Sequence, residues 1–140
     1  MTALLDSSAM VAALDPRDPW HAAVRTSLAG ERFVPRLPIT VLPEVAWLVD
    51  SRRGSRVAAA VIRAIAAGTW PIEPVDNDDV RRAGELLERY ADSRLSFVDA
   101  TVVALAERLG VSRIYTLDRH DFGLVRPKHV AAFELLPVLP

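Results

Sequence analysis

The sequence predicts an α/β fold: a three-layer αβα sandwich with a central, mostly parallel, twisted sheet. Short apolar runs, typical of buried strands, alternate along the chain with longer stretches that have helical spacing. Parallel strands need a crossover between them, and a helix is the usual crossover. Helices placed in this way cover both faces of the sheet. Because the 140 residues contain no internal repeat and no long linker, we expect a single domain over residues 1–140.

Proline and glycine separate the elements expected in the first half of the chain. The apolar run 2–5 predicts a strand, and the two serines that follow Asp6 supply hydroxyls that can cap a helix. Thr40 can cap a later helix, whose first turn tolerates Pro43 because an N–H there has no helical partner. Gly54 ends this helix. The expected strands are residues 2–5, 32–34 and 70–75, and the expected helices are residues 8–14, 20–28, 40–49 and 55–67.

The second half of the chain has a clearer pattern. Acidic residues at 76–79 can cap one helix, and Ser96 can cap another, which Gly110 ends. Apolar side chains recur along one face of this last helix. The apolar run 113–117 predicts a buried strand. The expected helices are residues 80–90 and 97–109, and the expected strands are residues 113–117 and 133–136.

Composition narrows the class of protein. The chain is 51% hydrophobic and 25% charged, which is typical of a folded globular domain. No apolar run approaches the roughly 18 residues needed to span a bilayer, and the N-terminal run lacks a basic leader, so we expect no signal peptide. The absence of cysteine excludes disulfides and thiolate metal sites and favours a cytoplasmic protein. A net charge of −1 argues against nonspecific coating of nucleic acid, although it is compatible with a nuclease.

Four carboxylates lie in strongly apolar surroundings. Asp6, Glu44, Asp99 and Asp118 each interrupt or end an apolar run. A charge held against apolar surface is costly unless it is compensated, and four acids of one sign cannot compensate each other. Hard divalent cations prefer carboxylate oxygen, so the pattern predicts a metal-dependent enzyme.

The predicted topology brings these acids together. Asp6 and Asp118 directly follow expected strands, whereas Glu44 and Asp99 lie in the first turns of expected helices. The carboxyl ends of parallel strands and the amino ends of the crossover helices share one edge of the sheet, where ligands bind in such folds. Helix capping is the alternative role for a single aspartate after a strand, so Asp6 could cap the helix after it and Asp118 could begin a turn. Capping explains Glu44 and Asp99 less well, because they interrupt apolar stripes.

The sequence also resembles a known family. The resemblance is carried by four stretches in order, which together cover nearly the whole chain: LLDSSAMVAAL at 4–14, LPEVAWLV at 42–49, ERYADSRLSFVDATVVALAERLGV at 88–111 and IYTLDRHDFGLVRP at 114–127. It is similar to the PIN-domain ribonucleases, and more closely to the VapC toxins of bacterial toxin–antitoxin pairs. The resemblance implies a PIN-like fold with an acidic site at Asp6, Glu44, Asp99 and Asp118. It adds Asp121 as a candidate fifth acid and Ser8 as a hydroxyl that supports the first aspartate.

The resemblance implies a metal-dependent endoribonuclease, the toxin of a type II toxin–antitoxin pair, which would hydrolyse RNA with water activated by Mg²⁺ or Mn²⁺. We expect Asp6 and Asp99 to be the primary metal ligands, and Glu44 and Asp118 to complete the site directly or through water. The resemblance implies a cognate VapB-like antitoxin as partner, and we expect a homodimer. Four basic residues after Asp118 are candidates to border the cleft and contact RNA, with ordinary solvated surface as the alternative for each: Arg119, His120, Arg126 and Lys128.

Two other functions remain open at this point. An acidic site of this kind also occurs in phosphoryl-transfer proteins of the receiver or phosphatase type. A receiver needs a lysine near the aspartates, but the single lysine is Lys128, and a haloacid-type phosphatase needs an aspartate at position 8, which is serine. The acids could instead serve a non-catalytic metal-binding or interaction module. Metal-dependent cleavage of RNA would distinguish a ribonuclease from both of these alternative functions.

Overall fold

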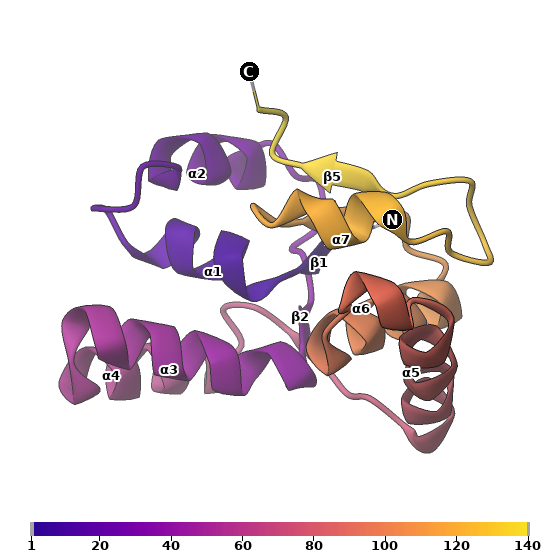
Figure 1. Cartoon of the computed structure of the whole chain (residues 1–140). Coiled ribbons are helices and arrows are strands. Elements are labelled where there is room, and N and C mark those ends of the chain that lie inside the picture. Colours follow the sequence, from indigo (N-terminus) through magenta and orange to yellow (C-terminus); the bar gives the residue numbers. More distant parts are fainter. Residues whose placement is uncertain (1, 140) are drawn as a thin grey trace.

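The computed structural model describes residues 2–139, and its middle layer consists of parallel strands (Figure 1). Strand β1 (Leu4–Leu5) pairs with β4 (Arg113–Tyr115), which pairs with β5 (Glu134–Leu136). Strand β2 (Leu37–Pro38) pairs with β3 (Ile72–Glu73). All of these pairings are parallel, as predicted from the alternation of strands and helices.

A single bridge joins the three-stranded sheet and the two-stranded sheet into one layer. Leu4 bridges Arg36, and the Leu5 N–H donates to the Arg36 carbonyl at 3.0 Å. Strand β1 therefore has β2 on one side and β4 on the other, which gives the order β3-β2-β1-β4-β5. The chain crosses from one side of β1 to the other, so the carboxyl end of β1 is the switch point at which α/β folds bind ligands.

Helices cover this layer on both sides, which confirms the predicted αβα architecture. In Figure 1, helices α1 to α4 lie to the left of the central strands and helices α5 and α6 lie to the right. Buried side chains of β1 and β4 and of helix α6 form the centre of the core. The helices are α1 (Ser7–Leu14), α2 (His21–Ala29), α3 (Leu42–Arg53), α4 (Ser55–Ala66), α5 (Asn77–Arg89), α6 (Phe97–Leu109) and α7 (Arg119–Leu124), with 3₁₀ turns at Ile39–Val41 and Ala91–Ser93.

Helices α5 and α6 illustrate how the sequence sets element ends. The side chain of Ser96 accepts a hydrogen bond from the Asp99 N–H at 3.1 Å, so the predicted cap of α6 is confirmed. Gly110, at φ 69°, ends the same helix. Helix α5 begins earlier than expected because Asp76 and Asp79 form a reciprocal capping box, which adds a turn at its amino end.

Two sequence-based expectations were wrong, and one helix was missed. Residues 32–34 form no strand, and Phe33 and Val34 are 51% and 54% exposed. The strand instead lies just after Pro35, which has no N–H to donate. The backbone N–H groups that follow Pro35 donate to carbonyls of neighbouring chain segments, and this pairing forms the strand. The Thr40 hydroxyl bonds to Thr101 at 2.7 Å and caps no helix. Helix α7 was not predicted, since its six residues carry no apolar periodicity.

No helix between residues 2 and 139 is both long and apolar enough to cross a membrane.

Candidate active site

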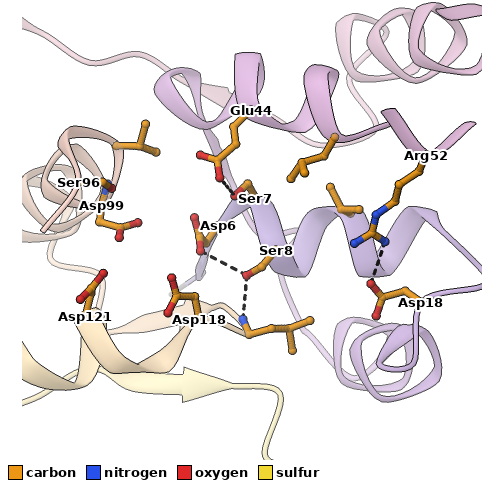
Figure 2. Close-up of a pocket in the computed structure, with 14 residues that line it drawn as sticks. Asp6, Ser7, Ser8, Asp18, Glu44, Arg52, Ser96, Asp99, Asp118 and Asp121 are labelled. Carbon is orange, nitrogen blue, oxygen red and sulfur yellow. Dashed lines mark hydrogen bonds and ion pairs between the residues drawn. The ribbon is translucent and has the colours of Figure 1, made fainter. Parts of the chain in front are cut away.

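A cleft of about 430 Å³ opens at the carboxyl edge of the strands (Figure 2). Its charged lining consists of six acids and one arginine, and serine hydroxyls and aliphatic side chains complete the wall. The lining residues are Asp6, Ser7, Ser8, Val11, Asp18, Glu44, Leu48, Arg52, Ser96, Val98, Asp99, Leu117, Asp118 and Asp121. A pocket with this charge repels anions until a cation enters it.

All four acids predicted from apolar context line this one cleft. Asp6 follows β1 and its N–H donates to the Tyr115 carbonyl at 2.9 Å, which fixes it beside the end of β4. Asp118 precedes α7, Glu44 lies in the first turn of α3, and Asp99 lies in the first turn of α6. Four distant parts of the sequence thus contribute carboxylates to one site, as the predicted topology required.

The tightest group of acids includes one that apolar context did not reveal. Carboxylate oxygens of Asp99, Asp118 and Asp121 lie within 4.8 Å of one another. Asp121 is in the first turn of α7, and the resemblance alone had suggested it. Asp6 and Glu44 lie outside this group, although they line the same cleft. The chain therefore offers an all-oxygen donor set, which suits a hard divalent cation.

Hydroxyl groups hold the two remaining acids. Asp6, only 4% exposed, accepts a hydrogen bond from the Thr116 hydroxyl at 2.9 Å. Ser8, the hydroxyl expected to support the first aspartate, donates to the same carboxylate oxygen at 3.4 Å. Ser7 donates to Glu44 at 2.8 Å. These contacts orient the carboxylates before any ligand arrives.

The capping alternative finds no support in this geometry. Asp6 occupies the N-cap position of α1 and Asp118 that of α7, yet neither side chain forms a capping hydrogen bond. The Asp6 carboxylate instead accepts from the Thr116 hydroxyl, whose oxygen also accepts from the Asp118 N–H at 3.1 Å. Thr116, which is fully buried, therefore links the two strand ends that carry these acids.

Ionising the acids of the cleft at the same time is energetically unfavourable. Burial, followed by the nearby charge of Asp6 and then those of Asp121 and Asp118, raises the pKa of Asp99 from 3.8 to about 7. Burial also raises the pKa of Asp6, despite the opposing hydrogen bonds from Thr116 and Ser8, and the charge of Glu44 adds to the rise. A bound cation reverses this balance, because opposite charge favours the ionised carboxylates.

The basic residues expected to contact RNA do not line the cleft. Among the described residues, the lining includes none of Arg119, His120, Arg126 and Lys128. Arg119 donates to the Thr116 and Pro137 carbonyls, and Lys128 lines a separate groove beside Glu107. The basic residue in the cleft is Arg52, at the end of α3, which sequence reasoning missed because Arg52 and its neighbours form an ordinary polar helix end.

A parallel α/β sandwich with a carboxylate cluster at the switch point of its sheet is the arrangement of a PIN-type nuclease domain. The chain belongs to this family, since the PIN domain family model matches residues 3–126.

Known relatives agree with this assignment. The chain is 31% identical to "Ribonuclease VapC26" of Mycobacterium tuberculosis over 96% of this chain and 99% of that protein. It is similar to the solved structure of Mycobacterium tuberculosis VapC20, described as a "Sarcin-Ricin loop cleaving toxin", with a TM-score of 0.78, 27% identity, and coverage of 85% of this chain and 92% of that chain. A "Toxin-antitoxin complex from Klebsiella pneumoniae" shares the fold, with a TM-score of 0.66, 18% identity, and coverage of 89% and 92%.

Proposed function

We propose that this protein is a metal-dependent endoribonuclease that acts as the toxin of a type II toxin–antitoxin pair. The convergence of acids from four separate segments in one cleft carries the proposal. A phosphodiester is an anion, and this cleft can accept it only after a cation offsets the carboxylates. Membership in the PIN domain family and the similarity to "Ribonuclease VapC26" support RNA as the substrate.

The catalytic residues proposed are Asp6, Glu44, Asp99 and Asp118, with Asp121 as a further ligand. The oxygens of Asp99, Asp118 and Asp121 lie within 4.8 Å of one another, which supports a cation shared by these three acids. When bound, Mg²⁺ or Mn²⁺ supplies an activated water and charge relief on the phosphate.

The residues around these acids prepare the site for that chemistry. Thr116 and Ser8 keep the Asp6 carboxylate at the cleft wall, and Ser7 does the same for Glu44. A protein nucleophile is not needed, and the serines of α1 donate to carboxylates, with no histidine among the residues that line the cleft. The proposed reaction is therefore hydrolysis by water with the acids as ligands.

Cleavage assays with controlled metal test this proposal. Purified protein is incubated with bacterial total RNA in EDTA, and then with Mg²⁺ or Mn²⁺ added in excess. We expect no cleavage in EDTA and restored cleavage with either ion, giving products with a 5′-phosphate and a 3′-hydroxyl. Cleavage that persists in EDTA and leaves a cyclic phosphate overturns the mechanism, because that product requires attack by the ribose hydroxyl.

The proposed partner is a small VapB-like antitoxin. Similarity to proteins named VapC supports a partner of this kind, and a free ribonuclease in a cell has to be restrained. An arginine from the antitoxin fits the acidic cleft, since a guanidinium binds carboxylates through charge-assisted hydrogen bonds. We also propose a homodimer; size-exclusion chromatography with light scattering distinguishes it from a monomer.

The phosphoryl-transfer alternatives gain nothing from the structure. Lys128, the single lysine, lies in a groove outside the acidic cleft, so it cannot serve as the lysine of a receiver site. A haloacid-type phosphatase needs an aspartate at position 8, but this position holds a serine. The Ser8 hydroxyl donates to Asp6 and accepts a hydrogen bond from the Leu117 N–H at 2.9 Å.

A further inference from the structure

Arg52 is placed at one end of the cleft, away from the clustered acids. Among residues 2–139 it is the one basic residue in the lining (Figure 2). It follows Glu44 by eight residues on the same helix, which puts the two Cα atoms roughly 12 Å apart along the axis at the usual helical rise. Figure 2 shows its guanidinium beside Asp18, at the opposite end of the cleft from Asp99 and Asp121.

Two well-buried carboxylates hold this arginine in place. Its Nη1 donates to Asp15 at 3.1 Å and to Asp18 at 3.0 Å. The carboxylate side chains are only 10% and 8% exposed, whereas the Arg52 side chain is 41% exposed. The hydrogen bonds that Arg52 donates to Asp18 and Asp15 keep the guanidinium charged, since they raise its pKa.

Only part of the guanidinium is used by these contacts. Within the described part of the chain, both hydrogen bonds come from Nη1, and none uses Nε or Nη2. Nε and Nη2 together present donors in a planar fork, the geometry that binds two oxygens of one phosphate. Because the acids already fix the side chain, a ligand that binds these donors loses little further rotamer freedom.

We propose that Arg52 forms a phosphate subsite, which binds a phosphodiester of the RNA strand next to the scissile one. The inference rests on the proposed nuclease function and specifies how the strand is held. Figure 2 shows Arg52 at the opposite end of the cleft from Asp99 and Asp121, so it lies away from a phosphate bound at the clustered acids. A strand crossing the cleft therefore has the scissile phosphate at the acids and a flanking phosphate at Arg52.

A matched pair of variants tests the subsite. Arg53, the next residue, approaches Asp15 at 3.6 Å with similar exposure but is not among the cleft-lining residues of the described chain. The substrate is a 5′-labelled RNA oligonucleotide that carries a cleavage site mapped with the wild-type protein. We expect Arg52→Gln to raise KM about tenfold with little change in kcat, and Arg53→Gln to change neither. We also expect Arg52→Gln to lower the slope of log affinity against log salt by about 0.7, the value for one single-strand phosphate contact.

Neutral substitutions in the RNA test the same contact without altering the fold. A methylphosphonate, which removes one backbone charge, is placed at each position flanking the scissile bond. At one of these positions, we expect the methylphosphonate to raise the KM of the wild-type protein. The same substitution should leave the KM of Arg52→Gln unchanged, because the contact between the two partners is already lost in that variant. Arg52→Lys keeps the charge but loses the fork, so its KM should lie between those of wild type and Arg52→Gln.

The outcomes separate this inference from the proposed function. If wild type cleaves RNA and Arg52→Gln keeps its KM and salt dependence, the subsite is wrong and the nuclease proposal stands. If Arg52→Gln has a lower melting temperature but an unchanged KM, the role of Arg52 is to hold the loop at Asp15 and Asp18. This result also overturns the subsite. If no flanking methylphosphonate affects the wild-type protein, the subsite is also wrong. If wild type cleaves no RNA with either metal, both proposals fail.

Discussion

Asp99 is the acid of the cleft whose pKa is raised from 3.8 to about 7, so it is far more readily protonated than a free aspartate in the metal-free protein. Burial and the negative charge of Asp6 are the two largest causes. The same features make Asp99 a suitable ligand, because a cation that enters the cleft relieves both at once. Function and stability therefore oppose each other at this residue.

Replacing Asp99 with asparagine should separate the two effects. Asp99→Asn retains the size of the side chain and the capping bond from the backbone N–H of residue 99 to Ser96, but removes the charge of a proposed metal ligand. We expect loss of RNA cleavage together with a gain of about 1–2 kcal/mol in the free energy of unfolding in EDTA above pH 7. Denaturant titration and the cleavage assay measure the two quantities. Asp78→Asn, at an exposed acid of α5 that pairs with Arg81, is the control for cleavage and should leave it unchanged. Wild-type cleavage by folded Asp99→Asn overturns the site assignment.

The raised pKa of Asp99 also predicts how stability depends on pH. Folding favours the protonated carboxyl, so its contribution is full below the ordinary pKa of 3.8 and is lost as pH rises to about 7. In EDTA, we expect the free energy of unfolding of wild type to fall relative to that of Asp99→Asn over this range. Saturating Mn²⁺ should abolish or reverse the difference. Parallel pH profiles of the two proteins in EDTA would contradict the assigned shift.

Individual side chains differ in how far the sequence reveals them. Asp6, Glu44, Asp99 and Asp118 could be predicted because each places a charge inside an apolar run, which is costly without a partner. Asp121 follows polar residues in the sequence, where an ionised carboxylate carries no desolvation penalty. The sequence around it therefore gives no sign of a functional role. Thr116, Ser7 and Arg52 were missed for a related reason: their roles depend on contacts with residues distant in sequence.

At the level of elements, two glycines have opposite consequences. Gly54 joins α3 to α4 at φ 86°, a conformation that is strained for any other residue. Gly84 lies on the exposed side of α5, where an added Cβ meets nothing within 4 Å. The first glycine is required by the turn, and the second only weakens its helix.

This contrast predicts stability changes of opposite sign. Gly54→Ala should destabilise the fold by about 1 kcal/mol because the alanine cannot relax at this φ. Gly84→Ala should stabilise it by about 0.5–1 kcal/mol through helix propensity. Thermal unfolding in EDTA measures both, and neither variant should lose RNA cleavage, since the two glycines do not line the cleft. A destabilised Gly84→Ala would show that propensity does not control α5.

Elements were predictable where local signals agreed with the fold. Helix α6 has a serine cap, an apolar face and a terminal glycine, and all three signals appear in the structure. Strand β2 has only two residues and comes shortly after a proline, so its sequence gives a weak strand signal. The expected strand was placed at residues 32–34 because apolar residues occur there, but these residues are exposed. Strand β2 depends on long-range pairing, and helix α7 has only six residues, so neither leaves a clear periodicity in the sequence.

At the scale of the molecule, topology explains why the acids meet. Strand β1 lies between β2 and β4, so the chain crosses from one side of the sheet to the other at the strand that carries Asp6. The helices that carry Glu44 and Asp99 begin at the same edge. The alternation of strands and helices was enough to predict this convergence. The distances between carboxylates were not predictable, since they depend on how α7 positions Asp121.

Expression in a bacterial host tests the proposed function of the whole protein. We expect induction of the wild-type chain alone to arrest growth, because cleavage of an essential RNA stops protein synthesis. Asp6→Ala should remove the toxicity, since it deletes a carboxylate at the switch point of the sheet. Its soluble yield must match that of wild type, because Asp6 is buried and its loss leaves the Thr116 hydroxyl without this acceptor.

Co-expression then tests the partner. If the gene encoded beside this one specifies the antitoxin, its product should restore growth and copurify with the wild-type chain. The Asp6→Ala protein should copurify with it as well, provided that contacts outside the cleft supply most of the binding energy. Charge-reversed Asp118→Lys weakens the complex if an antitoxin arginine enters the acidic cleft, because two cations then oppose each other. Harmless high-level expression of soluble wild-type protein, in a host whose RNA contains its target, would count against a toxin even if the purified protein cleaves RNA.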